Sequence, residues 1–252
     1  MNEYYYNESI ARFYDKVYDK LEFLKPAQKF YHEEIMAAKG PVLEAGVGSG
    51  RIFVPALNAG ADIYGIDISE NMLKQLINKL DENNRHRVSI NDIRNFRIGK
   101  KFDLVISPFR VFQHFITIED QLNALNCIYD HLNPGGSYIF DVFNPDLSRL
   151  IKDVDNLLEF DGEYEPGKKL KRYVTVKNEI NKQILNVTFS FAWDEDGEEK
   201  HDEFFSPMRY FFRYELEHLV SRTKFKSYVI YGDFKRNELD NSKKEFVVVC
   251  KK

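Results

Sequence analysis

The sequence lacks the features of an exported, membrane-spanning or metal-clustered protein. Its 252 residues include only two cysteines, Cys127 and Cys250, whose separation fits neither a zinc site nor a disulfide framework. No apolar run approaches the roughly 20 residues that cross a bilayer. Residues 1–20 are charged throughout and lack the apolar stretch of a secretory leader. We therefore expect a cytoplasmic protein that binds no metal and no membrane.

A basic excess is also missing. The chain has 36 Lys and Arg residues against 40 Asp and Glu residues, which gives a net charge of −4. Proteins that bind nucleic acids usually carry surplus positive charge that pairs with phosphates. We therefore expect no nucleic-acid partner. With 43% apolar residues, the chain is long enough to bury the core of one α/β domain with an insertion.

Short apolar strands alternate with amphipathic helices between residues 40 and 143. Ser69 and Thr117 stand where helix N-caps are expected, since each hydroxyl can accept a hydrogen bond from the first helical turn. This alternation predicts a parallel sheet covered on both faces, with a turn at 133–136 before the last strand. The expected strands are 41–46, 61–69, 87–92, 101–109 and 137–143, and the expected helices are 51–60, 70–83 and 117–132.

The segment from residue 145 to 211 departs from this alternation. An antiparallel meander is expected here, with strands at 170–178, 182–193 and 199–205. One face of the middle strand is apolar and needs a cover, either the main domain or a second copy of the chain. That face carries Leu185, Val187, Phe189, Phe191 and Trp193. The α/β pattern then resumes, with a helix at 213–223 and strands at 225–234 and 244–252.

Three glycines on alternate positions, Gly46, Gly48 and Gly50, lie between the first strand and the first helix. Glycine loses more conformational entropy on folding than any other residue, so three together need a reason. Such a loop lets the backbone touch a ligand at the carboxyl end of a sheet. Asp67 ends the second strand and is placed to accept hydrogen bonds from ribose hydroxyls. A nicotinamide dinucleotide and S-adenosylmethionine both satisfy this pattern.

The spacing of the glycines and the residue before them distinguish the two ligands. Dinucleotide sites use G-x-G-x-x-G, whereas this loop is G-x-G-x-G and follows Glu44. A carboxylate suits a ligand with an ammonium and a sulfonium and would repel a pyrophosphate. The loop resembles the first motif of class I S-adenosylmethionine-dependent methyltransferases. Four further stretches resemble that family's later motifs in order, namely IYGIDIS, INDIRNF, FDLVIS and HLNPGGSYIFDVF.

The resemblance implies a Rossmann-like α/β fold with a seven-stranded, mostly parallel sheet, one antiparallel strand and the inserted meander. It implies a helical lid at residues 1–39, a cofactor-binding core at 40–144 and 212–252, and a substrate cap at 145–211. S-adenosylmethionine is then the cofactor and S-adenosylhomocysteine the product, with no metal. The implied cofactor-binding residues are Tyr14, Glu44, Ala45, Gly46, Gly48, Gly50, Asp67, Ile68, Met72, Asp92, Ile93 and Ser107.

Within the family the layout is similar to small-molecule methyltransferases that act on glycine or on amino sugars, which carry a meander at this place. The similarity implies that Tyr14 contacts the methionine part of the cofactor, although Tyr14 and Tyr18 could equally serve packing. His114 is a candidate general base, because its ordinary pKa is near neutrality. Arg110 is a candidate clamp for an acceptor carboxylate or phosphate. Packing for His114 and simple solvation for Arg110 are the alternatives.

We therefore expect an enzyme that methylates a nitrogen or an oxygen of a small molecule. The stretch SPFR at 107–110 allows a second interpretation, because it is a degenerate form of the (N/D/S)-P-P-(F/Y) motif of methyltransferases that act on nucleic-acid or protein amide and amino groups. A third interpretation is a protein that binds the cofactor without catalysis. The uncovered face of the meander also makes a homodimer through that element a candidate assembly.

Overall fold

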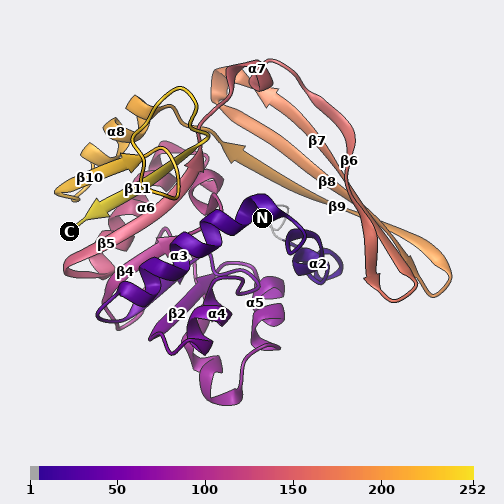
Figure 1. Cartoon of the computed structure of the whole chain (residues 1–252), viewed down its shortest axis with the longest axis horizontal. Helices are drawn as coiled ribbons and strands as arrows, with labels where there is room; N and C mark the ends of the chain where they lie inside the picture. The colour runs from indigo at the N-terminus through magenta and orange to yellow at the C-terminus, as the bar shows by residue number, and fades with distance from the viewer. Residues whose placement is uncertain (1–5) are drawn as a thin grey trace.

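The computed structural model describes residues 6–252, so the first five residues of the expected lid lie outside the described part. Figure 1 shows two sheets that stand apart, with the N-terminal helices between them. One sheet has seven strands and the other has four. Among the described residues, no helix combines the length and the apolar character needed to cross a bilayer.

The larger sheet has the strand order β10-β11-β5-β4-β1-β2-β3. Strands β1 to β5 pair in parallel, and β11 runs antiparallel to both of its neighbours. The predicted fold is therefore confirmed, including its one antiparallel strand. The strands are β1 (Val42–Ala45), β2 (Ile63–Asp67), β3 (Val88–Ile90), β4 (Phe102–Ser107), β5 (Leu132–Phe143), β10 (Ser227–Tyr231) and β11 (Glu245–Lys251).

Helices cover both faces of this sheet, because its strands are apolar on both sides. One face packs against α3 (Lys25–Ala37), α4 (Phe53–Asn58) and α5 (Glu70–Ile77). The other packs against α6 (Ile118–His131) and α8 (Arg213–Ser221). Both expected caps are confirmed. The Ser69 hydroxyl accepts the backbone N–H of Met72, and the Thr117 hydroxyl accepts that of Asp120.

The turn expected at 133–136 lies inside β5 rather than before it. The pairing of β5 with β4 begins at Leu132, opposite Phe102, and resumes at Ser137, opposite Leu104. Gly135 sits in the register shift with φ +79°. Glycine tolerates this left-handed conformation, so the turn bulges from the strand without ending its pairing. A short 3-10 turn, η2 (Glu82–Arg87), directly precedes β3, which is an edge strand of the sheet.

The four-stranded sheet follows the short helix α7 (Leu147–Leu150) and has the order β6-β7-β8-β9. Three of its strands match the expected meander, whereas β6 was not predicted. Strand β6 lies at the edge, most of its side chains are exposed, and its pairing with β7 shifts register. Its sequence therefore lacks the alternation that marks a half-buried strand. The strands are β6 (Val154–Glu165), β7 (Lys168–Glu179), β8 (Ile184–Glu195) and β9 (Glu198–Arg209), with the turn η4 (Ile180–Lys182) between β7 and β8.

Part of the apolar face of this sheet is covered by the N-terminal segment of the same chain. Figure 1 shows α2 between α5 and the strands of the smaller sheet. Ile10, Phe13 and Val17 are buried there against Phe191 and Trp193. The expectation that the main domain or a second copy covers this face was therefore incomplete, because two short helices cover Phe191 and Trp193, whereas Phe189 faces the main domain across a cavity. The N-terminal segment is residues 6–24, which contain α1 (Glu8–Ala11), α2 (Tyr14–Tyr18) and the turn η1 (Glu22–Leu24).

Phe13 is expected to contribute most of the docking free energy of this segment. Its side chain is fully buried, with its ring centroid 4.9 Å from that of Tyr164 and 5.3 Å from that of Trp193. Replacing Phe13 with alanine should cost about 3 kcal/mol of unfolding free energy, as for other buried phenylalanines. Urea denaturation followed by the fluorescence of Trp193, the one tryptophan of the chain, measures this. Phe23→Ala is the control, because Phe23 is 64% exposed; equal costs for the two variants would contradict the packing described.

Candidate active site

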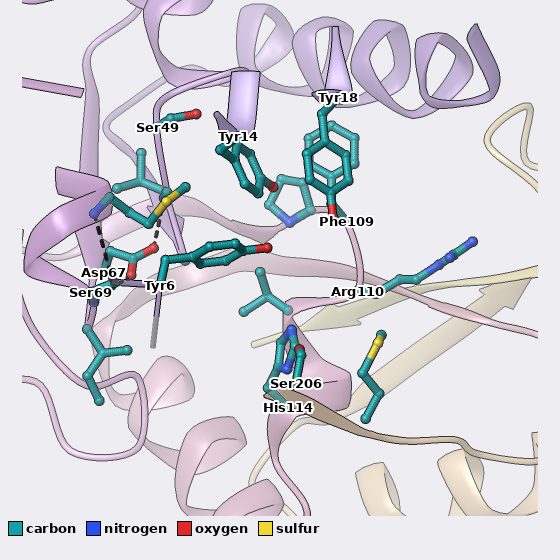
Figure 2. Close-up of a pocket in the computed structure, with 18 of the residues that line it drawn as sticks. Tyr6, Tyr14, Tyr18, Ser49, Asp67, Ser69, Phe109, Arg110, His114 and Ser206 are labelled. Carbon is teal, nitrogen blue, oxygen red and sulfur yellow. Dashed lines mark hydrogen bonds between the residues drawn. The ribbon is translucent and has the colours of Figure 1, made fainter. Parts of the chain in front are cut away.

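A cavity of about 770 Å³ lies where the core, the N-terminal segment and the smaller sheet meet. Its floor is formed by the carboxyl ends of β1 and β2 and the loops that follow β3 and β4. Figure 2 shows Tyr6 and Tyr14 facing the same space as Asp67 on one side and His114 and Ser206 on the other. The carboxyl edge of a parallel sheet is the usual ligand site of such folds. One continuous cavity thus joins the glycine loop to the meander.

Two of the three loop glycines are required by packing. A Cβ on Gly46 would lie 2.7 Å from the side chain of Val111, and one on Gly50 would lie 2.4 Å from that of Leu76. Both glycines also have φ near +90°. Side chains at these positions would collide with Val111 and Leu76, which pack against the loop from other parts of the chain. Gly46 lines the cavity, whereas Gly50 lies behind its wall.

Gly48 is different, because its free side faces the cavity. The nearest atom to a Cβ there would be Cε of Met72, at an ordinary 3.5 Å, although φ is +53°. The backbone N–H of Gly48 donates to Oδ2 of Asp67 at 2.8 Å, and that of Ser69 donates to Oδ1 at 2.8 Å. Asp67 therefore holds the glycine loop and the start of α5 together. Burial raises the pKa of Asp67, and these backbone donors oppose the shift.

Glu44 and Arg51 lie on the same wall of the cavity, and each has buried polar atoms without a hydrogen-bond partner among the described residues. Glu44 is 2% exposed, and its Oε2 accepts no hydrogen bond from the described residues. Burial and the negative charge of Asp67 raise its pKa well above the usual range. Arg51 likewise keeps Nε and Nη2 buried without acceptors within residues 6–252. Its guanidinium lies 4.6 Å from the ring centroid of Phe109, a cation–π distance.

Asp92 lies in the cavity wall but is already bound. Arg94 donates to its Oδ2 at 2.5 Å and also to Oδ1 of Asp120 at 2.8 Å. Burial raises the pKa of Asp92, but hydrogen bonds from Arg94 outweigh it, so the pKa is lowered and the carboxylate is charged. A ligand amine at Asp92 must therefore share the carboxylate with Arg94.

Three tyrosines of the N-terminal segment form an aromatic wall. The ring centroids of Tyr14 and Tyr18 lie 4.4 Å apart, and those of Tyr6 and Tyr14 lie 5.3 Å apart. Tyr14 therefore packs against its neighbours and lines the cavity at the same time. Burial raises its pKa, so its phenol stays neutral and can donate a hydrogen bond. Packing against Tyr18 and contact with a ligand in the cavity are therefore both open to Tyr14 in this geometry.

His114 is held on a rigid turn at the acceptor side of the cavity. It ends η3 (Val111–His114), and the preceding Gln113 donates to the carbonyl of Arg209 at 2.8 Å and accepts the N–H of Phe143 at 3.1 Å. The His114 side chain is exposed to the cavity. Burial within the protein lowers its pKa, while a hydrogen bond to the carbonyl of Pro207 opposes the shift. The ring is therefore neutral, with one nitrogen occupied and one available.

Arg110 lines the cavity, but its charge is used within the protein. Its Nη2 donates to Oε1 of Glu245 at 3.0 Å, and Figure 2 shows the side chain extending away from His114. Phe109 and Arg110 both have positive φ, at 59° and 68°. Their N–H groups donate to the buried Asp141, which stabilises this strained conformation. Burial raises the pKa of Glu245 to about 7.

Most of the residues expected at the cofactor and acceptor sites are brought together in the cavity wall. Ala45 and Ser107 are fully buried in β1 and β4, and with Gly50 they do not line it. Sequence reasoning missed Arg51, although it directly follows Gly50, and it missed the buried Arg172 of β7, for which no local pattern exists. The expected residues that do line the cavity are Tyr14, Glu44, Gly46, Gly48, Asp67, Ile68, Met72, Asp92, Ile93, Arg110 and His114.

Comparison with known proteins places residues 42–136 in a family described as a methyltransferase domain. The chain is 29% identical over 100 residues to dTDP-3-amino-3,4,6-trideoxy-alpha-D-glucopyranose N,N-dimethyltransferase of Streptomyces venezuelae, covering 40% of this chain and 41% of that protein. It is 28% identical over 147 residues to malonyl-[acyl-carrier protein] O-methyltransferase 2 of Ilyobacter polytropus, covering 55% and 54%. The chain thus spans about half the length of these curated relatives.

Solved structures are similar over nearly the whole chain. An S-adenosylmethionine-dependent methyltransferase from Clostridium acetobutylicum superposes with a TM-score of 0.74 at 18% identity, covering 96% of this chain and 97% of the other. DesVI of Streptomyces venezuelae superposes with a TM-score of 0.72 at 18% identity, covering 98% and 99%. Both likenesses concern the fold alone. Residues 42–136 therefore match a methyltransferase domain, and the whole chain has the fold of S-adenosylmethionine-dependent methyltransferases.

Proposed function

We propose that this protein transfers a methyl group from S-adenosylmethionine to a nitrogen or an oxygen of a small-molecule acceptor. The observation that carries the proposal is the single cavity that joins the glycine loop and Asp67 to His114 and the smaller sheet. The cofactor would occupy the loop side, and the acceptor would occupy the side formed by β8 and β9. The two curated relatives are named as an amino-sugar N,N-dimethyltransferase and a malonyl-[acyl-carrier protein] O-methyltransferase, which supports a methyltransferase and leaves the acceptor atom open.

The charges beside the glycine loop fit the amino-acid end of this cofactor. A buried carboxylate oxygen and buried guanidinium nitrogens without partners are costly, unless a ligand supplies the missing groups. An α-ammonium would satisfy Glu44, and an α-carboxylate would satisfy Arg51. Binding of the ammonium would also favour the charged form of Glu44, whose pKa is raised in the structure. A pyrophosphate would instead place negative charge beside two carboxylates, Glu44 and Asp67.

Asp67→Ala is expected to weaken cofactor binding by about 10- to 100-fold, the usual effect of losing hydrogen bonds to a charged group. The proposed ribose contact would be lost, and so would the bond that holds Gly48. Calorimetric titration with S-adenosylhomocysteine measures the change. Asp62→Ala is the control, because Asp62 lies beside the opposite end of β2, exposed, and pairs with Arg87. Equal affinities for the two variants would remove Asp67 from the site.

The cofactor, when bound, supplies an activated methyl group on a sulfonium, so the protein mainly aligns the reactants and excludes water. The acceptor lone pair forms the new bond to the methyl carbon as the carbon–sulfur bond breaks. We assign to Tyr14 the orientation of the methionine part. We assign to His114 the removal of the acceptor proton, since its neutral ring keeps one nitrogen free. This chemistry requires no metal.

The acceptor side of the cavity has an apolar wall with few polar groups. Aromatic side chains of β8 and β9, Phe189 and Phe204, line it together with Met208, and Asn186 and Ser206 supply hydrogen-bonding groups. Such a lining suits a compact organic molecule with a nucleophilic nitrogen or oxygen near His114. Incubation with S-adenosylmethionine and panels of amines, amino acids, amino sugars and hydroxylated metabolites, with S-adenosylhomocysteine as the readout, tests this. Turnover on a protein or nucleic acid but on no small molecule would contradict it.

We infer the roles of the three parts of the chain from the same cavity. The N-terminal residues to 39 act as the lid, residues 40–144 and 212–252 as the cofactor-binding core, and residues 145–211 as the substrate cap. Any homodimer through the cap would use its exposed edge, because its apolar face is already covered. That edge carries Leu157 and Leu158, which are 56% and 47% exposed. A cytoplasmic location stays a prediction from the cysteine content.

A further inference from the structure

A hydrogen-bonded junction centred on Asp15 joins the N-terminal segment to the glycine loop. Oδ1 of Asp15 accepts the hydroxyl of Ser49 at 2.6 Å, and Oδ2 accepts Nζ of Lys79 at 2.5 Å. Nζ of Lys79 also donates to the backbone carbonyl of Ser49 at 2.8 Å. The three groups therefore close a ring between α2, the glycine loop and the turn after α5. Neither the cofactor contacts nor the chemistry proposed above uses Asp15.

The junction lies where the N-terminal segment contacts the glycine loop of the proposed cofactor site. Ser49 is buried between Gly48 and Gly50, and Tyr14 precedes Asp15 in the chain. Helix α2 has five residues and no side-chain N-cap, so its own hydrogen bonds fix it weakly. The position of Tyr14 therefore depends on contacts outside the helix. Figure 2 shows Tyr14 and Ser49 next to each other on one wall of the cavity.

Other contacts hold the same segment on its opposite side. Arg12 pairs with Glu195 at 2.8 Å, and Asn7 donates to Asp202 at 2.7 Å, both on the smaller sheet. Phe13 is buried in the same interface. Loss of the Asp15 junction would therefore free the segment from the glycine loop without detaching it from the meander. The side chains of Lys79 and Asp15 are 37% and 27% exposed, so water reaches the pair and it can break and re-form.

We propose that Asp15 is a positioning residue that fastens the lid over the bound cofactor through Ser49 and Lys79. The junction slows release of the cofactor and holds Tyr14 against the methionine part. The proposal rests on the proposed function, because it requires S-adenosylmethionine in the cavity. Ser49 connects the two, since its hydroxyl bonds Asp15 while the backbone of the adjacent Gly48 faces the cavity.

The test is the dissociation rate constant of S-adenosylhomocysteine, measured by stopped-flow displacement with excess S-adenosylmethionine. Asp15→Asn should raise it about 10-fold, because a charge-assisted pair is lost. Lys79→Met should have a similar effect, and the double variant should add little, because both changes break one pair. Lys79→Arg should keep the slow release rate of the natural protein, because arginine can still pair with Asp15. Asp19→Asn is the matched control, an exposed acid at the end of the same helix.

The outcomes separate this proposal from the function on which it rests. If the natural protein binds S-adenosylhomocysteine and Asp15→Asn releases it at the rate of the Asp19→Asn control, the positioning role is wrong and the proposed function stands. If Asp15→Asn lowers only the melting temperature, with an unchanged release rate, the junction is structural and the proposal is also overturned. If the natural protein binds neither form of the cofactor, the proposed function fails and this proposal fails with it.

Discussion

Replacing His114 with asparagine is expected to lower kcat by about 100-fold or more, the usual contribution of a positioned acid or base. Cofactor affinity should change little, because His114 lies on the acceptor side of the cavity. Asparagine can still donate to the Pro207 carbonyl, so the turn should keep its conformation. The histidine has the free ring nitrogen that the asparagine lacks. Single-turnover rates with saturating cofactor measure the chemical step directly.

The pH dependence of the rate identifies the group responsible. Burial lowers the pKa of His114 below its ordinary value of about 6.5. A base must be unprotonated, so the rate should fall as the pH decreases through this lowered pKa and should stay flat above it. The asparagine variant should lack this acidic limb. Both profiles are measured on one acceptor whose own pKa lies well outside this range.

His218→Asn is the control for this experiment. His218 is an exposed histidine on α8 whose side chain is not part of the cavity wall, so its loss should leave the rate and the profile unchanged. The competing mechanism is proximity alone, with an acceptor that loses its proton in solution before it binds. That mechanism predicts a near-normal kcat for His114→Asn and an acidic limb set by the acceptor. Observing both would remove His114 from the reaction.

Gly48→Val is expected to abolish measurable cofactor binding while the chain stays folded. The free side of Gly48 faces the cavity, where Met72 is the one described neighbour that a Cβ on this residue would meet within 4 Å. A branched side chain would therefore project into the space of the ligand and clash with few protein atoms. Calorimetric titration with S-adenosylhomocysteine gives the binding result, and the far-ultraviolet circular dichroism spectrum checks the fold.

A smaller change separates steric exclusion from backbone strain. Gly48→Ala and Gly60→Ala both place a side chain on a residue with positive φ, at 53° and 92°, so each should cost about 1–2 kcal/mol of stability. A Cβ on Gly60 meets no described atom within 4 Å, and Gly60 lies outside the cavity wall. Only Gly48→Ala should weaken cofactor binding. Equal affinities for the two variants would show that the loop does not approach the ligand.

The larger sheet could be predicted from the sequence because its determinants are local. Most of the parallel strands contain a short apolar run, and the N-caps Ser69 and Thr117 mark where two of the helices begin. The glycine loop was equally clear, since three glycines with positive φ leave a pattern that few other structures need. The edge strand β6 was missed because exposure on most of its length removes the alternation on which the prediction depends.

The residues of the candidate site likewise differ in whether the local sequence predicts them. Residues next to the loop or at a strand end, such as Glu44 and Asp67, could be found because sequence adjacency places them at the carboxyl edge of the sheet. Arg172 could not, because it reaches the cavity only through the packing of the smaller sheet. There it pairs with Glu159 at 2.7 Å and lies 4.8 Å from the ring centroid of Tyr18. No local pattern encodes such long-range contacts.

The N-terminal segment shows most clearly which contacts could not be predicted from the sequence. Its Tyr14 was assigned to the cofactor by resemblance alone, and the side-chain partners of Asp15, Ser49 and Lys79, are brought to it only by the fold. Likewise, the apolar face of β8 clearly required a cover, but the sequence does not say which part of a chain supplies it. Phe13 supplies it because the segment passes between the two sheets.

The central claim is that the cavity binds S-adenosylmethionine through the glycine loop. Titration calorimetry of the natural protein with S-adenosylmethionine, S-adenosylhomocysteine and NAD, each in separate runs, tests it most directly. We predict saturable binding of the first two at one site per chain and weak or no binding of NAD, because Glu44 and Asp67 repel a pyrophosphate and complement a cationic amino-acid end. Tighter binding of NAD than of either sulfur compound would contradict the claim.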